Sequence, residues 1–198
     1  MPLLINEAAP PYKYGSSQLE FGPICTRKLQ LPLHVANIEN VGPGGLESDT
    51  HLTIRYGINE FEPGRMRTML SDEEPVVCTV TGIECFPDTK DGACIHFTVA
   101  VTPELLKLRK LIEDNADCIE PTFPVYKPHI TIGYFKKDKW ESEAARFKEL
   151  YEFPFHITAD NLMVSEKTGQ QYNHPLAKNH AEHKLAQLVK DRLRSPRG

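Results

Sequence analysis

A seven-residue stretch that occurs twice constrains this chain more than any other feature of its sequence. The first copy, at residues 51–57, is HLTIRYG, and the second, at residues 129–135, is HITIGYF. Both run His, aliphatic, Thr, Ile, any residue, Tyr, and their β-branched and aromatic content predicts strands. Side chains alternate between the two faces of a strand, so we expect each His and Thr to share a face. Two such strands placed face to face would form a small basic pocket with two imidazoles and two hydroxyls.

The bare pattern His-x-Thr is less specific, because it occurs four times, beginning at positions 51, 96, 129 and 156. Only the copies at His51 and His129 share the longer frame, with Ile and Tyr at matching offsets. Repetition alone leaves these two open to a catalytic role or to a role as hydrogen-bonded strand histidines. For His96 and His156 we expect polar residues on a half-buried sheet, with a substrate-facing role as the alternative.

Composition limits the class of ligand. A chain of 198 residues favours one domain with a substantial core. Its net charge of −4 provides no general positive field for long nucleic acid, so an anionic ligand is expected to be small and held by local groups. No segment approaches the ~18 consecutive apolar residues of a membrane span, and the sequence starts without a basic segment followed by an apolar run. We therefore expect a cytoplasmic protein with no membrane partner.

Cysteine and histidine spacings give no metal-site signature. The five cysteines form no C-x-x-C pair and are expected to be reduced packing residues. His180 and His183 lie around Glu182 at helical spacing, but the H-E-x-x-H pattern of zinc proteases is absent. We interpret this pair as part of a solvated helix face and expect no metal.

The rest of the chain mixes strands and helices. Residues 76–83 and 93–101 are typical of strands joined by a turn at residues 87–92, and Thr102 with Pro103 predicts the start of a helix. We further expect a strand or short helix at 29–38, a loop at 41–45 and a short helix within 59–70 that is broken near Pro63. Asp138 is expected to cap a helix with Trp140, Ala144, Phe147 and Tyr151 on one side. A strand at 153–164 and a helix at 178–194 follow. This mixture predicts an α+β fold built from two related lobes.

These residues together resemble the two-histidine (2H) phosphoesterase superfamily, which includes RNA 2′,3′-cyclic phosphodiesterases and 2′-5′ RNA ligase-like proteins. The likeness covers residues 47–172 and includes the middle segment from Gly82, the run YKPHITI from Tyr126 and the closing strand NLMVS from Asn161. It implies two pseudo-symmetric lobes, each an antiparallel sheet with flanking helices, around an active cleft. The domain is then expected at residues 12–175, after a flexible arm at 1–11 and before a C-terminal helix and basic tail at 176–198.

The resemblance implies phosphodiester cleavage without a metal or other cofactor. One of His51 and His129 would accept a proton from the nucleophile, and the other would protonate the leaving oxygen. Thr53 and Thr131 would donate hydrogen bonds to the phosphate oxygens that gain charge in the transition state. The nucleophile is left open between a ribose 2′-OH and water, as is the division of acid and base between the histidines.

Four further residues are candidates for substrate binding. Arg55 and Lys127 have the parity of the motif histidines, so each is expected either to add positive charge beside the phosphate or to be an ordinary surface residue. Tyr12 and Tyr14 are expected either to stack on a base or to pack in a loop.

The N-terminal half resembles one branch of the superfamily more closely. The runs YGSSQL from Tyr14 and ESDTHLTIRYG from Glu47 are similar to the phage anti-CBASS phosphodiesterases, which degrade the cyclic oligonucleotide messengers of bacterial immunity. This implies hydrolysis of 3′-5′ bonds in cyclic di- or trinucleotides such as cGAMP, in the host cytoplasm. The alternatives are an RNA 2′,3′-cyclic phosphodiesterase and a non-catalytic nucleotide-binding module. The oligomeric state is left open.

Overall fold

The computed structural model describes residues 13–71, 73–121 and 125–176 of the chain. The predicted arm at 1–11 and the predicted helix at 178–194, with His180 and His183, lie outside the described residues. Within them, none of the helices is long and apolar enough to cross a membrane. The five cysteines are free thiols.

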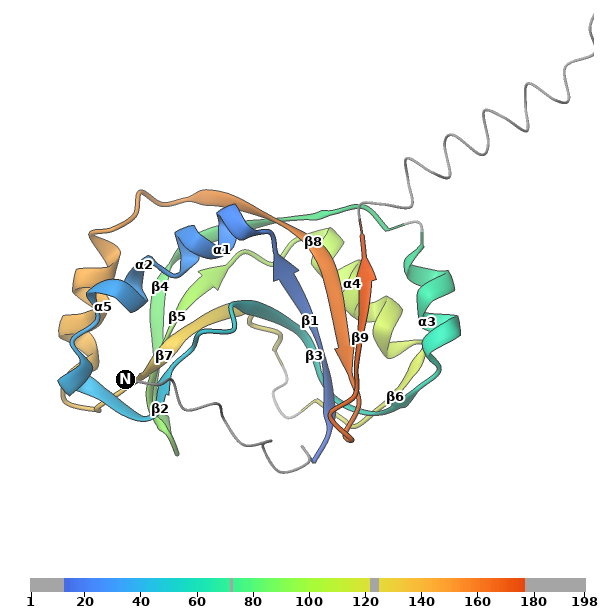
Figure 1. Cartoon of the computed structure of the whole chain (residues 1–198), viewed down its shortest axis with the longest axis horizontal. Helices are drawn as coiled ribbons and strands as arrows, with labels where there is room; N and C mark the ends of the chain where they lie inside the picture. The colour runs from blue at the N-terminus through green and yellow to red at the C-terminus, as the bar shows by residue number, and fades with distance from the viewer. Residues whose placement is uncertain (1–12, 72, 122–124, 177–198) are drawn as a thin grey trace, which may run out of the picture.

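The described strands form one antiparallel sheet, and both sequence motifs lie in it (Figure 1). Its order is β2-β7-β5-β4-β8-β1-β3-β6. Strand β9 pairs with residues 161–165 of β8, beyond the part of β8 that pairs with β4. The strands are β1 (Gly15–Phe21), β2 (Val41–Leu46), β3 (His51–Phe61), β4 (Val76–Thr89), β5 (Gly92–Val99), β6 (Ala116–Cys118), β7 (His129–Phe135), β8 (Phe155–Ser165) and β9 (Gln171–Pro175). The first motif opens β3 and the second opens β7.

The sheet bends so far that its two motif strands meet. Four strands separate β7 from β3 in the sheet order, yet Cα atoms of the two lie within 8 Å of each other. Figure 1 shows the sheet strongly curved, with β7 and β3 on the inner side of the curve. The bend divides the sheet into a first lobe of β2, β7, β5 and β4 and a second lobe of β8, β9, β1, β3 and β6.

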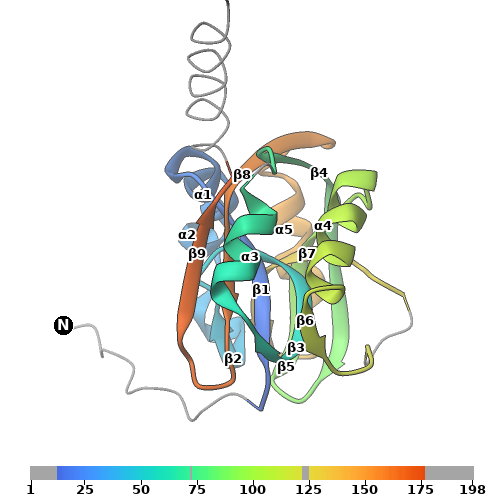
Figure 2. The same cartoon turned by 90° about the vertical axis from the view of Figure 1, so that its right-hand side faces the viewer.

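Helices pack against the outside of both lobes. Helix α5 contacts β4 and β5 of the first lobe, whereas α4 contacts β3 and β6 and α3 contacts β9 of the second (Figures 1 and 2). The helices are α1 (Pro23–Leu29), α2 (Leu31–Val35), the 3₁₀ helix η1 (Ile38–Asn40), α3 (Pro63–Leu70), α4 (Pro103–Glu113) and α5 (Trp140–Lys148). Apolar side chains between sheet and helices form the core, which leaves the other face of the motif strands for polar residues.

Helix α4 illustrates how local sequence fixes an element. The Thr102 hydroxyl accepts a hydrogen bond from the backbone N–H of Leu105 at 3.3 Å, as expected for an N-cap. Leu105, Leu108 and Ile112 recur at helical spacing and are buried against the second lobe. The predicted start of this helix and its apolar stripe are confirmed.

The predicted α+β class and the hairpin are confirmed, but several element boundaries are wrong. Residues 41–45 belong to strand β2 rather than to a loop, because Val41 and Leu46 at the two ends of this strand pair with Phe135 and Gly133 of β7. Residues 29–38 are mainly helical, and residues 59–61 continue β3 before α3 begins at Pro63. Helix α5 has Lys139 at its N-cap without a side-chain bond, and Tyr151 lies beyond its end, so Asp138 is not the cap.

Phe97 gives a direct test of the first lobe's core. Its ring is fully buried and makes edge contacts with Tyr151 and Phe155. We expect Phe97→Ala to lower the free energy of unfolding by about 3–5 kcal/mol, because it removes buried apolar area and leaves a cavity. Leu106→Ala, at a position that is 47% exposed on α4, is the matched control and should change stability by less than about 0.5 kcal/mol. Urea denaturation of the two variants measures both values; equal values would contradict this account of the core.

Candidate active site

The first motif presents His51 and Thr53 on the face of β3 that is turned away from the core. Their partners on β1 are Glu20 and Gln18, which share this face because directly paired residues point the same way. Both motif residues are half-buried, whereas Leu52 between them is fully buried. The imidazole Nδ1–H of His51 donates to the backbone carbonyl of Asp49 at 2.7 Å.

The second motif repeats this arrangement on β7. His129 and Thr131 are half-buried and pair with Thr98 and His96 of β5. The Nδ1–H of His129 donates to the backbone carbonyl of Lys127 at 2.8 Å. In both motifs, therefore, the histidine is bonded to the carbonyl two residues before it.

This carbonyl contact determines the chemistry that each histidine offers. A carbonyl only accepts hydrogen bonds, so Nδ1 must carry the hydrogen in both rings. A neutral imidazole in this tautomer has its lone pair on Nε2. Each of His51 and His129 thus has one ring atom, Nε2, that can take up or release a proton. This is the requirement for general acid–base catalysis.

Two observations place the two motifs close to each other. The hydroxyl of Tyr126 donates to the backbone carbonyl of Thr53 at 3.1 Å, which ties the segment before His129 to the opposite motif strand. Burial keeps the pKa of this tyrosine above its usual value, so the hydroxyl remains a donor. Cα atoms of β3 and β7 also lie within 8 Å of each other. The pKa of His129 is lowered by burial and, to a smaller extent, by the charge of His51.

His96, for which the sequence left open a half-buried polar residue or a substrate-facing one, lies beside His129. Its ring is stacked on Phe86 at 4.1 Å between centroids and lies 5.1 Å from the ring of His129, while Phe86 contacts His129 edge-on at 5.1 Å. Its Nδ1–H donates to the carbonyl of Cys94 at 3.2 Å, which is the contact that the motif histidines make. Burial lowers the pKa of His96 to about 4. His156, by contrast, is exposed and bonded to the Thr79 hydroxyl at 3.0 Å.

The expected position of Arg55 is wrong, because β3 carries a bulge. Thr53 pairs with Gln18 and Arg55 with Ser17, which leaves Ile54 as an extra residue between them. A bulge reverses the alternation of side chains beyond it. Arg55 therefore turns to the buried face with Ser17, and Tyr56 takes the place on the motif face that Arg55 was expected to have.

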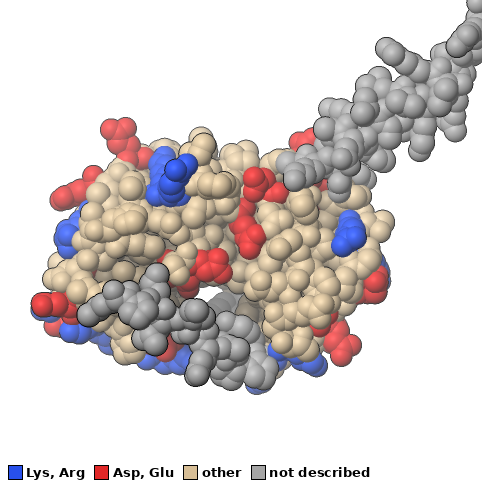
Figure 3. Space-filling model, in the orientation of Figure 1, with Lys and Arg blue, Asp and Glu red and all other residues tan. Residues whose placement is uncertain are grey.

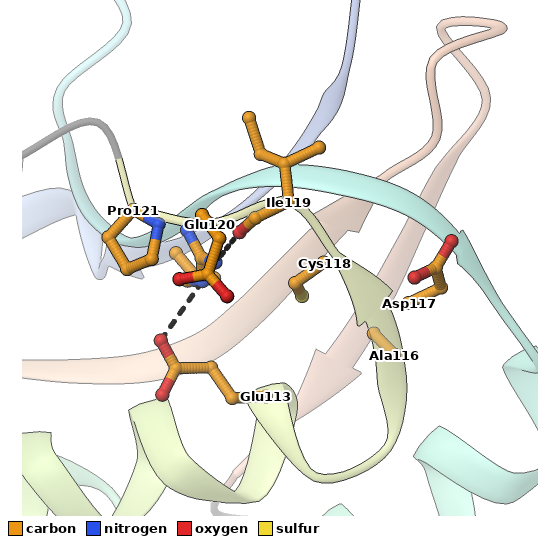
Figure 4. A pocket seen from close by; sticks show the side chains of 8 residues that line it. Glu113, Ala116, Asp117, Cys118, Ile119, Glu120 and Pro121 are labelled. Carbon is orange, nitrogen blue, oxygen red and sulfur yellow. Dashed lines mark hydrogen bonds and ion pairs between the residues drawn. The ribbon is translucent and has the colours of Figure 1, made fainter.

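The guanidinium of Arg55 is engaged by protein groups on that other face. It is 6% exposed and pairs with Glu113 of α4, with 3.0 Å between Nε and the carboxylate oxygen. Its two Nη groups donate to the backbone carbonyls of Tyr56 and Ile119. Figure 4 shows Glu113 and Ile119 at a pocket of about 350 Å³ that Arg55 also lines. The pocket is bordered by α4, β6 and residues 119–121, and none of its lining residues is a motif His or Thr.

The other candidate binding residues are placed as follows. Lys127 is exposed next to the second motif, and its positive charge helps to lower the pKa of His96. Tyr14 lies directly before β1, with its ring 6.2 Å from that of Tyr56. Tyr12 lies outside the described residues.

Charged side chains of both signs are scattered over the face of the molecule shown in Figure 3, with an acidic group near its middle. Within the described ranges, no group of three or more His, Cys, Asp or Glu side chains is arranged to hold a metal ion.

The low pKa of His96 predicts a dependence of stability on pH. In the folded state His96 stays unprotonated until the pH falls to about 4, whereas a histidine in the unfolded chain is protonated below a pH of about 6.5. Stability should therefore fall as the pH decreases from about 6.5 to 4, by on the order of 3 kcal/mol from this group. His96→Phe, which keeps a ring beside Phe86, should lose this contribution.

Urea denaturation of both proteins at pH 7 and pH 4 measures the effect. The relevant quantity is the difference between the two proteins, because the carboxyl groups that titrate in this range are common to both. An identical loss of stability in the two would contradict a buried, neutral His96.

Comparison with known proteins agrees with the fold described above. Residues 46–170 match the family described as the 2′-5′ RNA ligase superfamily, whereas a search of curated proteins found no match. The structure of E. coli LigT with 3′-AMP is similar over 82% of this chain and 94% of that protein, with a TM-score of 0.51 and 14% identity. TT0787 of Thermus thermophilus is similar over 83% and 99%, with a TM-score of 0.50 and 13% identity. E. coli LigT with NADP+ gives 84% and 96%, a TM-score of 0.50 and 13% identity.

Proposed function

This chain belongs to the 2′-5′ RNA ligase superfamily of two-histidine phosphoesterases, and from that premise we propose that it hydrolyses phosphodiester bonds of cyclic oligonucleotides. The observation that carries the proposal is the pair of histidines, His51 and His129, on facing strands. Each is held through Nδ1 by a backbone carbonyl, which leaves Nε2 for proton transfer. The general class of activity, that of a phosphodiesterase-type hydrolase, follows from the family and its fold, whereas the cyclic oligonucleotide substrate is our proposal.

We assign the general base to His129 and the general acid to His51. Burial among Phe86 and His96 lowers the pKa of His129, so its Nε2 is unprotonated at neutral pH and can accept the proton of the nucleophile. The nucleophile is a ribose 2′-OH or water. His51, the other motif histidine, then supplies the proton of the leaving oxygen, and the carboxylate of Asp49 lies 3.9 Å from its Nδ1.

Cleavage of the phosphodiester couples two proton transfers to the exchange of one bond at phosphorus. As His129 takes the proton, the nucleophile forms a bond to phosphorus, and the bond from phosphorus to the leaving oxygen breaks. His51 gives its proton to that oxygen. Thr53 and Thr131 donate hydrogen bonds to the non-bridging oxygens, where negative charge grows in the transition state.

The nucleotide class of the substrate is supported by relatives and by residues near the cleft. E. coli LigT has been crystallised with 3′-AMP and with NADP+. In this chain, Lys127 places a positive charge beside the second motif, and Tyr14 carries an aromatic ring near the first. We propose a cyclic di- or trinucleotide messenger of the anti-CBASS type, which would be met in the cytoplasm of a phage-infected host. The net charge of −4 disfavours long RNA.

Removing either motif histidine should abolish most of the activity. We expect His51→Ala and His129→Ala each to lower kcat by about 10²–10⁴-fold, because each removes one proton-transfer group. His156→Ala, at the exposed histidine bonded to Thr79, is the matched control and should keep kcat close to that of the wild type. Thermal denaturation of all three checks that the fold is retained. A fully active His129→Ala variant would refute the two-histidine mechanism.

Activity should also survive chelation. The proton transfers and charge stabilisation come from imidazole and hydroxyl groups, so the rate with EDTA should equal the rate without it. A rate that collapses on chelation and returns with added zinc would exclude the mechanism proposed here.

A panel of substrates tests the class. Purified protein is incubated, with EDTA present, with 3′,3′-cGAMP, a cyclic trinucleotide and an RNA oligomer ending in a 2′,3′-cyclic phosphate, and products are resolved by chromatography. We expect linear products from the cyclic oligonucleotides and none with the His51→Ala/His129→Ala double variant. Opening of the RNA end alone would identify an RNA-end enzyme. Retention of an intact nucleotide without cleavage would identify a nucleotide-binding module.

A further inference from the structure

Tyr56 occupies a position on the motif face that regular strand alternation does not give it. Ser16, Gln18 and Glu20 alternate along β1 on the face shared with the first motif. Their partners on β3 are Tyr56, Thr53 and His51. Ser16 and Gln18 are two residues apart on a strand, so Tyr56 and Thr53 are about 7 Å apart along the sheet.

The ring of Tyr56 is available to a ligand. It is 49% exposed, whereas the residues on either side of it, Arg55 and Gly57, are buried. Tyr14 meets it edge-on, with 6.2 Å between centroids and 88° between the ring planes. An edge-on neighbour supports one edge of a ring and leaves a face for stacking. Lys13 lies 5.2 Å from the Tyr14 ring and adds a positive charge nearby.

The backbone around Tyr56 is fixed by groups that have no contact with the cleft histidines. The buried guanidinium of Arg55 donates to the carbonyl of Tyr56 and is itself held by Glu113. Gly57 follows with a φ of 89°, a left-handed conformation that glycine adopts without strain. The bulge, the Arg55 contact and Gly57 therefore hold the backbone of Tyr56 in place on the sheet.

We infer that Tyr56, supported by Tyr14, is a stacking platform for the nucleobase attached to the phosphate that is cleaved. The inference rests on the proposed function, since it places that phosphate between the two motifs. A platform about 7 Å from Thr53 lies within one nucleotide of the phosphate. Stacking uses the π-face that every base has, so the platform binds purines and pyrimidines alike and does not choose between them.

Binding of mononucleotides tests this platform independently of catalysis. Isothermal titration calorimetry is performed with 3′-AMP, 3′-CMP and the base-free ribose 5-phosphate on the wild type and on Tyr56→Ala, Tyr56→Phe and Tyr56→Trp. We expect Tyr56→Ala to weaken binding of both mononucleotides about 5- to 150-fold. Tyr56→Phe and Tyr56→Trp keep an aromatic face and should bind within about twofold of the wild type or more tightly. Ribose 5-phosphate should bind all four proteins equally, and Leu106→Ala is the matched control.

The outcomes separate this inference from the proposed function. Unchanged 3′-AMP affinity in Tyr56→Ala, an equal loss for ribose 5-phosphate, or no binding of 3′-AMP to the wild type would each overturn the platform. If the wild type still cleaves cyclic oligonucleotides in any of these cases, the proposed function stands alone. If base-dependent binding depends on Tyr56 but no phosphodiester is cleaved, the platform stands and the proposed function fails.

Discussion

Backbone hydrogen bonds hold β4 to β8 along its first part and to β5 along the remainder, so this long strand links the two lobes. The ladders carry register shifts at Val80–Gly82 of β4 and where Glu20 and Phe21 of β1 pair with β8. Such irregularities let a strand turn without losing its ladder. The active cleft depends on this curvature, because in a flat sheet the strands of His51 and His129 would be separated by four others.

The two walls of the cleft are alike in hydrogen bonding and unlike in surroundings. Each motif histidine bonds the carbonyl two residues before it, a contact that His96 also makes. His129 lies against the rings of Phe86 and His96. His51 faces Glu20 across the ladder and has the carboxylate of Asp49 nearby. One motif is thus placed in an aromatic and in an acidic environment.

Much of this was predictable from sequence where the cause is local. The repeated frame identified both motif strands, the turn residues identified the hairpin of β4 and β5, and Thr102 identified the start of α4. What escaped prediction depends on partners distant in the chain. The bulge that exchanges Arg55 and Tyr56 exists only in the pairing of β3 with β1, and β2 is a strand only because β7 pairs with it. Likewise, only the adjacency of β5 and β7 places His96 beside His129.

The carbonyl contacts at Nδ1 also allow the same site to run the reaction in either direction. Because both rings are held in the same tautomer, each can serve as acid or as base without rotating or exchanging its hydrogen-bond partner. A step run backwards needs only that the two rings exchange protonation states. By microscopic reversibility, a geometry that opens a phosphodiester can, with the ends of a strand held in place, also close one.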